Sequence, residues 1–202
     1  MKTLHTFGDS HSKLSWGKVS IPWLDVKTHW MGPRLMFSFG RDGLAMLDIS
    51  QPQHKVSNGD YVCFCFGEID CRCHLNKFHD TYESEIKKLV AAYFEAIRQN
   101  VEKMRDIKVL VFMVTPTIFR GPKHDNPNGE FQYRGTPEQI RQYTEAMNLE
   151  LDTQCTQNGY LFVDVYREYC DEIGFLNRKF SDSSCHIIDN RYIKEWCEQY
   201  LA

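Results

Sequence analysis

The sequence has no long hydrophobic run, no block of like charges and no low-complexity tract. No apolar segment approaches the ~20 residues that a membrane-spanning helix requires, so no membrane span is expected. The 24 lysines and arginines and the 27 aspartates and glutamates are mixed along the chain, which argues against a nucleic-acid partner or an anionic membrane surface. An apolar signal segment is also missing, because Lys2 and the pair Gly8-Asp9 come too soon. These absences predict a cytoplasmic protein.

Internal repeats and an interdomain linker are absent as well. The 202 residues suit one domain, which we expect to span residues 1–202. Eight cysteines in a secreted chain would suggest four disulfides. Without an export signal, free thiols in a reducing compartment are the better interpretation.

Four of the cysteines form two closely spaced pairs, Cys63-x-Cys65 and Cys71-x-Cys73, and His74 follows the second. Zinc sites typically separate such pairs by about two to four residues, whereas one residue separates them here. We therefore expect thiols of the core, no metal and no cofactor. A metal-dependent or thiol-based activity built on this cysteine group is the weaker alternative.

Strand-like and helix-like segments alternate along the chain. Strands are expected at residues 2–7, 26–31, 61–66, 107–114 and 160–165, and the continuously apolar runs 61–66 and 107–114 predict buried strands. Apolar residues three and four apart predict helices at 80–104, 136–158 and 190–201. This order predicts a three-layer α/β/α sandwich with a mostly parallel sheet.

Two helix starts carry the pattern of a capping box, Asp80 with Glu83 and Thr136 with Gln139. Between the helices, residues 119–134 contain prolines and glycines and show no periodicity, so they predict a long loop. We expect this loop, together with residues 41–58, to shape substrate specificity.

The first predicted strand ends at Gly8, and Ser10 follows two positions later. A serine hydroxyl is a weak nucleophile unless a base takes its proton. That base is usually a histidine held by a carboxylate on its other ring nitrogen. Asp182 and His186 are the candidates, because one polar loop before the last helix could present both to Ser10.

The motif Gly8-Asp9-Ser10 near the N-terminus, a glycine turn after the third strand and an Asp/His pair near the C-terminus resemble the SGNH, or GDSL-type, hydrolases. The resemblance implies a flavodoxin-like α/β/α fold and the cleavage of esters, often acyl or acetyl groups on sugars or lipids. It also implies Ser10 as nucleophile, His186 as general base and Asp182 as the residue that orients His186.

The sequence departs from that family pattern after the third strand. Where the family has Gly-x-Asn-Asp, this chain has Gly67-Glu68-Ile69-Asp70, and isoleucine cannot donate a hydrogen bond to an oxyanion. One such donor contributes about 10²–10³ in rate. Arg72 and His74 are the nearest groups that could replace it, unless the oxyanion hole is incomplete.

Two further positions leave alternatives open. The family's last block is Asp-x-x-His, but one more residue separates Asp182 from His186, so Asp189 is a second candidate partner. For the oxyanion glycine after the second strand, Gly32 is preferred and Gly40 is the reserve. The oxyanion hole and substrate contacts are thus expected from Gly32, Gly67, Glu68, Asp70 and Arg72.

These features predict a serine esterase or acyl hydrolase that forms an acyl-enzyme on Ser10 and acts on a small-molecule or glycan ester. An acyltransferase is one alternative. A non-catalytic module that binds a carbohydrate or a small molecule on the same fold is another, motivated by Ile69 and the displaced Asp182. Substrate identity and oligomeric state stay open.

Overall fold

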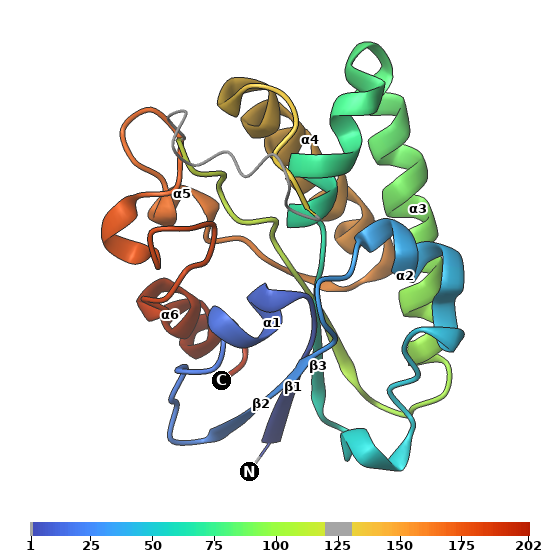
Figure 1. Ribbon diagram of the computed structural model, residues 1–202. Coiled ribbons are helices and arrows are strands. Elements are labelled where there is room, and N and C mark those ends of the chain that lie inside the picture. The colour runs from blue at the N-terminus through green and yellow to red at the C-terminus, as the bar shows by residue number, and fades with distance from the viewer. Residues whose placement is uncertain (1, 120–130) are drawn as a thin grey trace.

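The computed structural model describes residues 2–119 and 131–202. Its centre is a five-stranded sheet in the order β2-β1-β3-β4-β5, in which all neighbouring strands are parallel. The strands are β1 (Lys2–Gly8), β2 (Leu24–Trp30), β3 (Tyr61–Cys65), β4 (Lys108–Phe112) and β5 (Leu161–Val163). The predicted α/β/α sandwich with a mostly parallel sheet is therefore confirmed (Figure 1).

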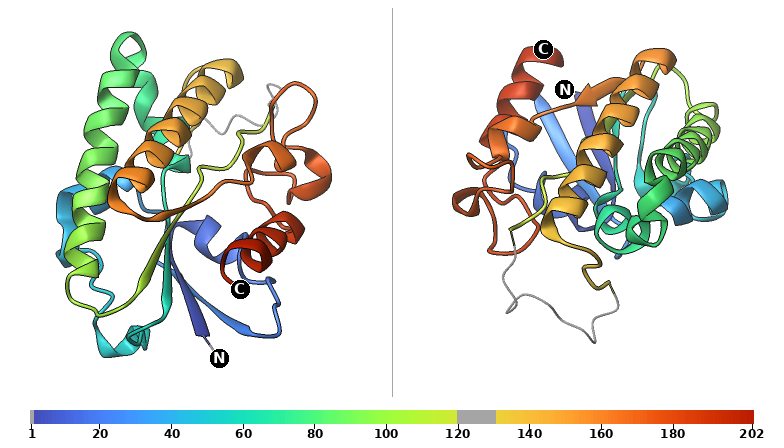
Figure 2. Two further views of the ribbon diagram at one scale, coloured as in Figure 1. Left: turned by 180° about the vertical axis from the view of Figure 1, so that it is seen from behind. Right: turned by 90° about the horizontal axis from the view of Figure 1, so that it is seen from above.

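Helices cover both faces of this sheet. The face that includes Phe7, Phe64 and Val111 packs against α2 (Met36–Asp42), α3 (Tyr82–Val101) and α4 (Pro137–Asn158). The face that includes Leu4, Cys63 and Phe112 packs against α5 (Tyr166–Tyr169) and α6 (Arg191–Tyr200), with the short α1 (Ser10–Leu14) on the same side. Figure 2 shows α3 and α6 on opposite sides of the sheet.

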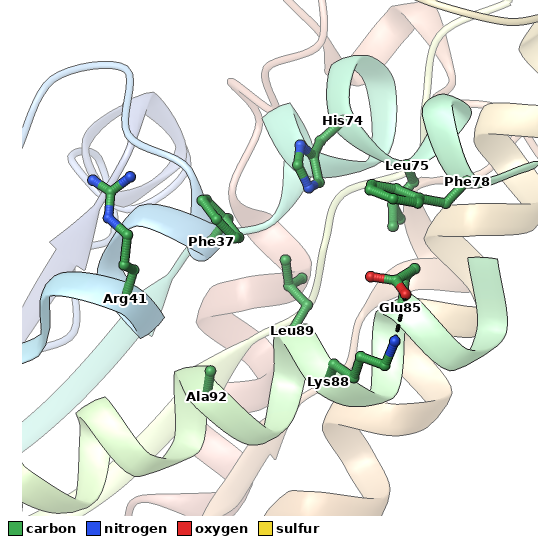
Figure 3. Close-up of a pocket in the computed structure, with 9 residues that line it drawn as sticks. All are labelled: Phe37, Arg41, His74, Leu75, Phe78, Glu85, Lys88, Leu89 and Ala92. Atoms are coloured by element: carbon green, nitrogen blue, oxygen red, sulfur yellow. Dashed lines mark hydrogen bonds and ion pairs between the residues drawn. The ribbon is translucent and has the colours of Figure 1, made fainter. Parts of the chain in front are cut away.

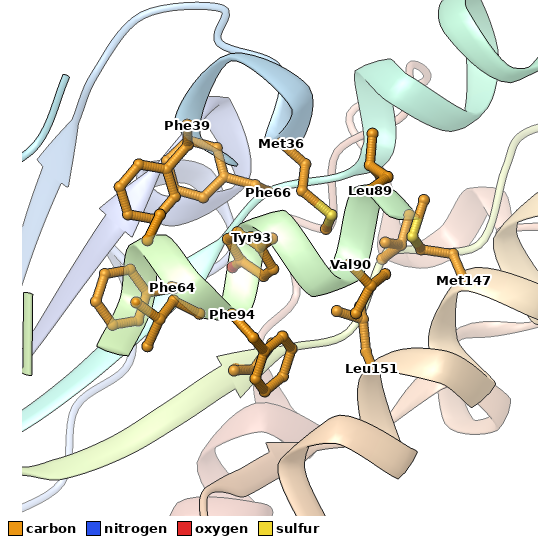
Figure 4. Close-up of a cluster of buried hydrophobic side chains, with 14 of the residues drawn as sticks. Met36, Phe39, Phe64, Phe66, Leu89, Val90, Tyr93, Phe94, Met147 and Leu151 are labelled. Carbon is orange, nitrogen blue, oxygen red and sulfur yellow. The ribbon is translucent and has the colours of Figure 1, made fainter. Parts of the chain in front are cut away.

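An aromatic cluster packs α2 and α3 onto the central strand (Figure 4). The ring of Phe39 from α2 lies 5.9 Å from that of Phe64 and 5.2 Å from that of Phe66. Tyr93 of α3 meets Phe39 edge to face at 5.8 Å. Such pairs add about 0.5–1.5 kcal/mol each beyond the area that they bury. This packing anchors α2, whose first turn borders the candidate site.

The cysteines lie mainly in these cores. All eight are free thiols, and six of them are buried. Cys63 and Cys65 point to the same side of β3 with their Sγ atoms 3.8 Å apart, as expected for thiols of the core. No helix among the described residues is long and apolar enough to cross a bilayer. The cytoplasmic location stays a prediction.

One of the two predicted capping boxes forms. Thr136 and Gln139 cap α4 reciprocally, and α4 ends at Gly159 with a φ of 69°. The other prediction is wrong, because α3 begins at Tyr82 and its N-cap, Thr81, makes no side-chain capping bond. Irregular helical turns over Asp70–His74 and Leu75–Thr81 lead directly into α3, so the chain before Tyr82 is already helical.

The register of the strands brings three loops together. Gly8 stands opposite Trp30 of β2 and opposite Cys65 of β3. Because the strands are parallel, the segments that follow them emerge at one edge, where sites form in open sheets of this type. Ser10, Gly32 and Gly67 each follow one of these three strand ends. Residues 120–130, most of the predicted loop 119–134, lie outside the described part of the chain.

Candidate active site

Ser10 is the first residue of α1, directly after β1. The turn requires a glycine at position 8, because a Cβ there would lie 1.9 Å from the backbone oxygen of Cys65. Asp9 is the N-cap of α1, and its Oδ1 accepts the backbone N–H of His11 at 2.9 Å. Burial raises the pKa of Asp9 well above its ordinary value, although this bond opposes the shift. Asp9 therefore shapes the turn as a buried carboxyl group.

Ser10, His186 and Asp182 form a continuous hydrogen-bonded chain. The Oγ of Ser10 lies 2.9 Å from Nε2 of His186, and Nδ1 of His186 lies 2.7 Å from Oδ2 of Asp182. Burial alone would raise the pKa of Asp182, but the bonds from His186 and from the Ser184 backbone hold it below its ordinary value. An ionised Asp182 accepts a hydrogen bond from Nδ1–H, which leaves a lone pair on Nε2 facing the serine hydroxyl.

The loop between Asp182 and His186 accommodates its extra residue by a tight turn. The backbone N–H of Asp182 donates to the oxygen of His186 at 3.2 Å, and Oδ1 of Asp182 accepts the Ser184 N–H at 2.9 Å. Ser183 takes a φ of 69° at the turn. Asp189, the alternative partner, is instead held by the Arg191 side chain at 2.7 Å.

Asp70 has a structural role in place of the expected substrate contact. Its Oδ2 and Oδ1 accept the backbone N–H groups of Met36 and Phe37, at 2.7 and 3.1 Å. Leu35, the N-cap of α2, offers no side-chain cap, so Asp70 supplies one from another loop. Burial raises the pKa of Asp70 to about 7 in spite of these bonds. Asp70 thus ties the loop around Gly32 to the turn after β3.

The turn after β3 also needs its glycine. Gly67 has a φ of 120°, and a Cβ there would lie 2.7 Å from the side chain of Val114. Ile69, which stands where the family has asparagine, is buried and apolar. It offers no side-chain donor to the site.

Glu68 and Arg72 form a largely buried ion pair one helical turn apart, with Nε 2.8 Å from Oε2. The Arg72 guanidinium also donates to the backbone oxygen of Phe131 and lies 5.0 Å from the ring centre of Tyr133. Burial lowers the pKa of Arg72, but Glu68 more than offsets this and raises it above the ordinary value. The positive charge is near enough to act on the pKa values of Asp9 and His11.

His74, the other proposed donor, belongs to a different cavity. Its ring stacks on Phe37 at 5.2 Å and lines an apolar pocket of about 390 Å³ between α2, the turns before α3 and α3 itself (Figure 3). Gly32, in contrast, lines a groove of about 360 Å³ with Met31, Leu35 and Phe131. Gly32 has a φ of 84°, and a Cβ added there would meet no atom within 4 Å.

Two side chains next to His186 could not be placed there from the sequence. His11 lies beside His186, with ring centres 5.2 Å apart, and Cys185 completes a group of three. Burial, followed by the charges of His186 and Arg72, lowers the pKa of His11 well below its ordinary value. The only signal in the sequence was adjacency: His11 follows Ser10, and Cys185 precedes His186.

Solved structures of known proteins share this arrangement of strands and helices. An extracellular lipase from Streptomyces rimosus superimposes with a TM-score of 0.62 at 12% identity, over 98% of this chain and 99% of that one. A GDSL-like lipase from Bacteroides thetaiotaomicron gives a TM-score of 0.58 at 14% identity, over 98% and 86% of the two chains. The chain has the SGNH, or GDSL-type, hydrolase fold.

An acetylxylan esterase from Geobacillus stearothermophilus shares this SGNH fold with a TM-score of 0.54 at 13% identity, over 98% of this chain and 93% of that one. No protein-family model matches the sequence, and no curated protein matches it either. The likeness therefore lies in the SGNH fold, and the chemistry must be argued from the side chains of this chain.

Proposed function

We propose that the protein is a serine ester hydrolase that forms an acyl-enzyme on Ser10. The observation that carries the proposal is the chain of two hydrogen bonds, 2.9 Å from Ser10 to His186 and 2.7 Å from His186 to Asp182. These distances fall within the reach that proton transfer from a nucleophile to its base requires.

The reaction follows from this arrangement. Nε2 of His186 takes the hydroxyl proton as Oγ of Ser10 attacks the ester carbon, and the carbonyl electrons move onto oxygen. Collapse of this intermediate expels the alcohol, which receives the proton from His186 and leaves the acyl group on Ser10. Water then gives a proton to His186, attacks the acyl group and releases the acid, and Ser10 recovers its proton. Asp182 stabilises the imidazolium in both halves.

Backbone donors are the basis for the oxyanion hole. Among the described residues, the N–H groups of Ser10 and Gly32 donate to no other protein group. Both follow neighbouring strand ends, and Asp70 fixes the loop after Gly32 through α2. We assign these two N–H groups to the oxyanion. Arg72, three residues after Ile69 and paired with Glu68, is the group we propose to supply positive charge in place of the family's asparagine.

The substrate class proposed is a small acylated carbohydrate or lipid. The groove beside Gly32, at about 360 Å³, is within the size range of small-molecule sites. Solved structures with the same fold include lipases and an acetylxylan esterase. A series of p-nitrophenyl esters from acetate to octanoate measures the acyl length that this groove accepts.

The test compares the turnover of p-nitrophenyl acetate by the wild-type protein, Ser10→Ala and His186→Ala. Loss of the nucleophile or base is expected to lower kcat on the order of 10⁴–10⁶-fold. Ser15→Ala is the matched control, because Ser15 is a buried serine at the end of α1 and its Oγ has no partner among the described residues. Equal turnover by wild-type and Ser10→Ala protein would refute the proposal. Transfer of the acetyl group to an added sugar would make the enzyme an acyltransferase, and absence of turnover in the wild type would favour a binding module.

A further inference from the structure

His186 belongs to a second group of side chains besides the hydrogen-bonded chain with Ser10. Potential ligand atoms of His11, Cys185 and His186 all lie within 4.8 Å of one another. Two imidazoles and one thiolate are a ligand set that suits zinc. His11 lies in the first turn of α1, and Cys185 and His186 lie in the loop that begins at Asp182. The fold brings these residues together although most of the chain separates them.

His11 provides an independent indication of a ligand. Its side chain is buried, and neither Nδ1 nor Nε2 has a hydrogen-bond partner among the described residues. A buried polar atom without a partner is costly, so such a pair of nitrogens calls for an explanation. A cavity of about 10 Å³ lined by His11, Asp9 and Thr115 has room for about one water molecule. One water molecule there satisfies at most one of the two nitrogens, which leaves the other for a different ligand.

Asp182 holds His186 in the orientation that a metal-binding histidine has. In metal sites, a histidine that binds through one ring nitrogen usually donates the other N–H to a carboxylate. His186 has this arrangement, with Nδ1 bonded to Asp182 and Nε2 available. The carboxylate that prepares Nε2 to take a proton therefore also prepares it to bind a metal ion.

We propose that His11, Cys185 and His186 form an inhibitory zinc site. The inference rests on the proposed function, since the metal ion would occupy the nitrogen that must accept the proton of Ser10. On binding, a Zn–S bond and two Zn–N bonds form, the Cys185 thiol releases its proton to solvent, and no oxidation occurs. Three protein ligands leave a fourth position for water.

Binding of a zinc ion requires the three ligand atoms to approach one another by at most about 1.5 Å. Zinc bonds of about 2.0–2.3 Å place tetrahedral ligand atoms roughly 3.3–3.6 Å apart, compared with an upper limit of 4.8 Å here. His186 is 20% exposed, so an ion from solvent reaches the group from its side. His11 and Cys185 are buried behind it.

The experiment measures metal binding and activity separately. Cobalt(II) is titrated into the apoprotein, and the charge-transfer absorption of a cobalt–thiolate bond is recorded. Zinc affinity follows from competition. Cys185→Ser and His11→Phe remove one ligand each and keep similar volume. Cys170→Ser is the control, because Cys170 is a half-buried thiol outside the group.

We expect one cobalt ion per chain with a thiolate band and zinc inhibition that a chelator reverses. In Cys185→Ser and His11→Phe, zinc affinity should fall by more than ~100-fold, the upper end of what loss of an outer-shell partner costs. Cys170→Ser should match the wild type. Absence of a thiolate band, zinc affinity that both variants retain, or activation by zinc would overturn the proposal. If Ser10 proves not to be catalytic, the cobalt band still reports the site, so failure of the proposed function is distinguishable from failure of this one.

Discussion

Replacement of Asp182 by asparagine changes the proton on His186 and little else. The amide oxygen of the new side chain can still accept the Ser184 N–H that Oδ1 accepts at 2.9 Å, so the loop keeps its turn. The amide NH₂ then faces Nδ1, which must become the acceptor. His186 consequently carries its proton on Nε2, where it meets the Ser10 hydroxyl at 2.9 Å and cannot take a second proton.

The size of the effect follows from the exposure of the pair. A fully buried partner of this kind contributes about 10⁴-fold to kcat. Asp182 is 32% exposed, so water can partly replace the carboxylate, and we expect a loss of about 10³-fold. That loss corresponds to about 4 kcal/mol in the activation free energy, at roughly 1.4 kcal/mol per tenfold.

The assay is the pH profile of kcat and KM for p-nitrophenyl acetate, with thermal melting to verify the fold. Asp189→Asn is the matched control, because Asp189 precedes the same terminal helix and pairs with Arg191. We expect its kcat to stay within about twofold of the wild type, since surface ion pairs of this kind contribute little. A kcat of Asp182→Asn within tenfold of the wild type, or an equal loss in Asp189→Asn, would refute the reasoning.

Three further predictions concern the surroundings of Ser10. The ordinary pKa of Asp70 is 3.8, and burial raises it to about 7 in the folded protein. As the pH rises, the unfolded chain therefore loses this proton before the folded protein does. The folded state consequently loses stability between about pH 4 and pH 7. Asp70→Asn should remove this loss of stability, which is up to about 4 kcal/mol in the wild type. The measurement is the urea midpoint of both proteins at pH 5 and pH 8, and an equal fall in wild type and variant would contradict the prediction. Gly8→Ala places a Cβ against the backbone oxygen of Cys65 and should lower the free energy of unfolding, measured in urea, by more than about 4 kcal/mol. Gly59→Ala, at a positive φ in open space, should lower it by only about 1–2 kcal/mol. Equal losses in the two variants would count against the close approach at Gly8. Arg72→Gln removes the positive charge, so we expect a fall in kcat of about 10²-fold, and a change in KM alone would argue against a role in the transition state.

The sequence predicted β1, β3 and β4 well because nearly all of their residues are buried. All five residues of β3 are buried, so the strand is apolar throughout, and α4 carries its capping residues next to its own first turn. The sequence gives no sign of the helical turns over residues 70–79. These turns are short and irregular, and they follow no apolar period that a pattern could detect.

At the site, local motifs were predictable and long-range contacts were not. The order of Ser10 and His186 along an α/β chain was enough to expect both at one sheet edge, and the structure brings them into hydrogen-bond reach. The choice between Asp182 and Asp189 depended on a positive φ at Ser183, which no pattern indicates for serine. The distant contact of Asp70 with the start of α2 likewise leaves no mark in the sequence.

The nucleophilic role of Ser10 is the central claim, and covalent labelling tests it most directly. The wild-type protein is treated with a fluorophosphonate, and the modified peptide is located by mass spectrometry. We predict one adduct per chain on Ser10, lost in Ser10→Ala and strongly slowed in His186→Ala, where no base takes the hydroxyl proton. An absence of adduct on folded wild-type protein, or an adduct at another residue that persists in Ser10→Ala, would contradict the account.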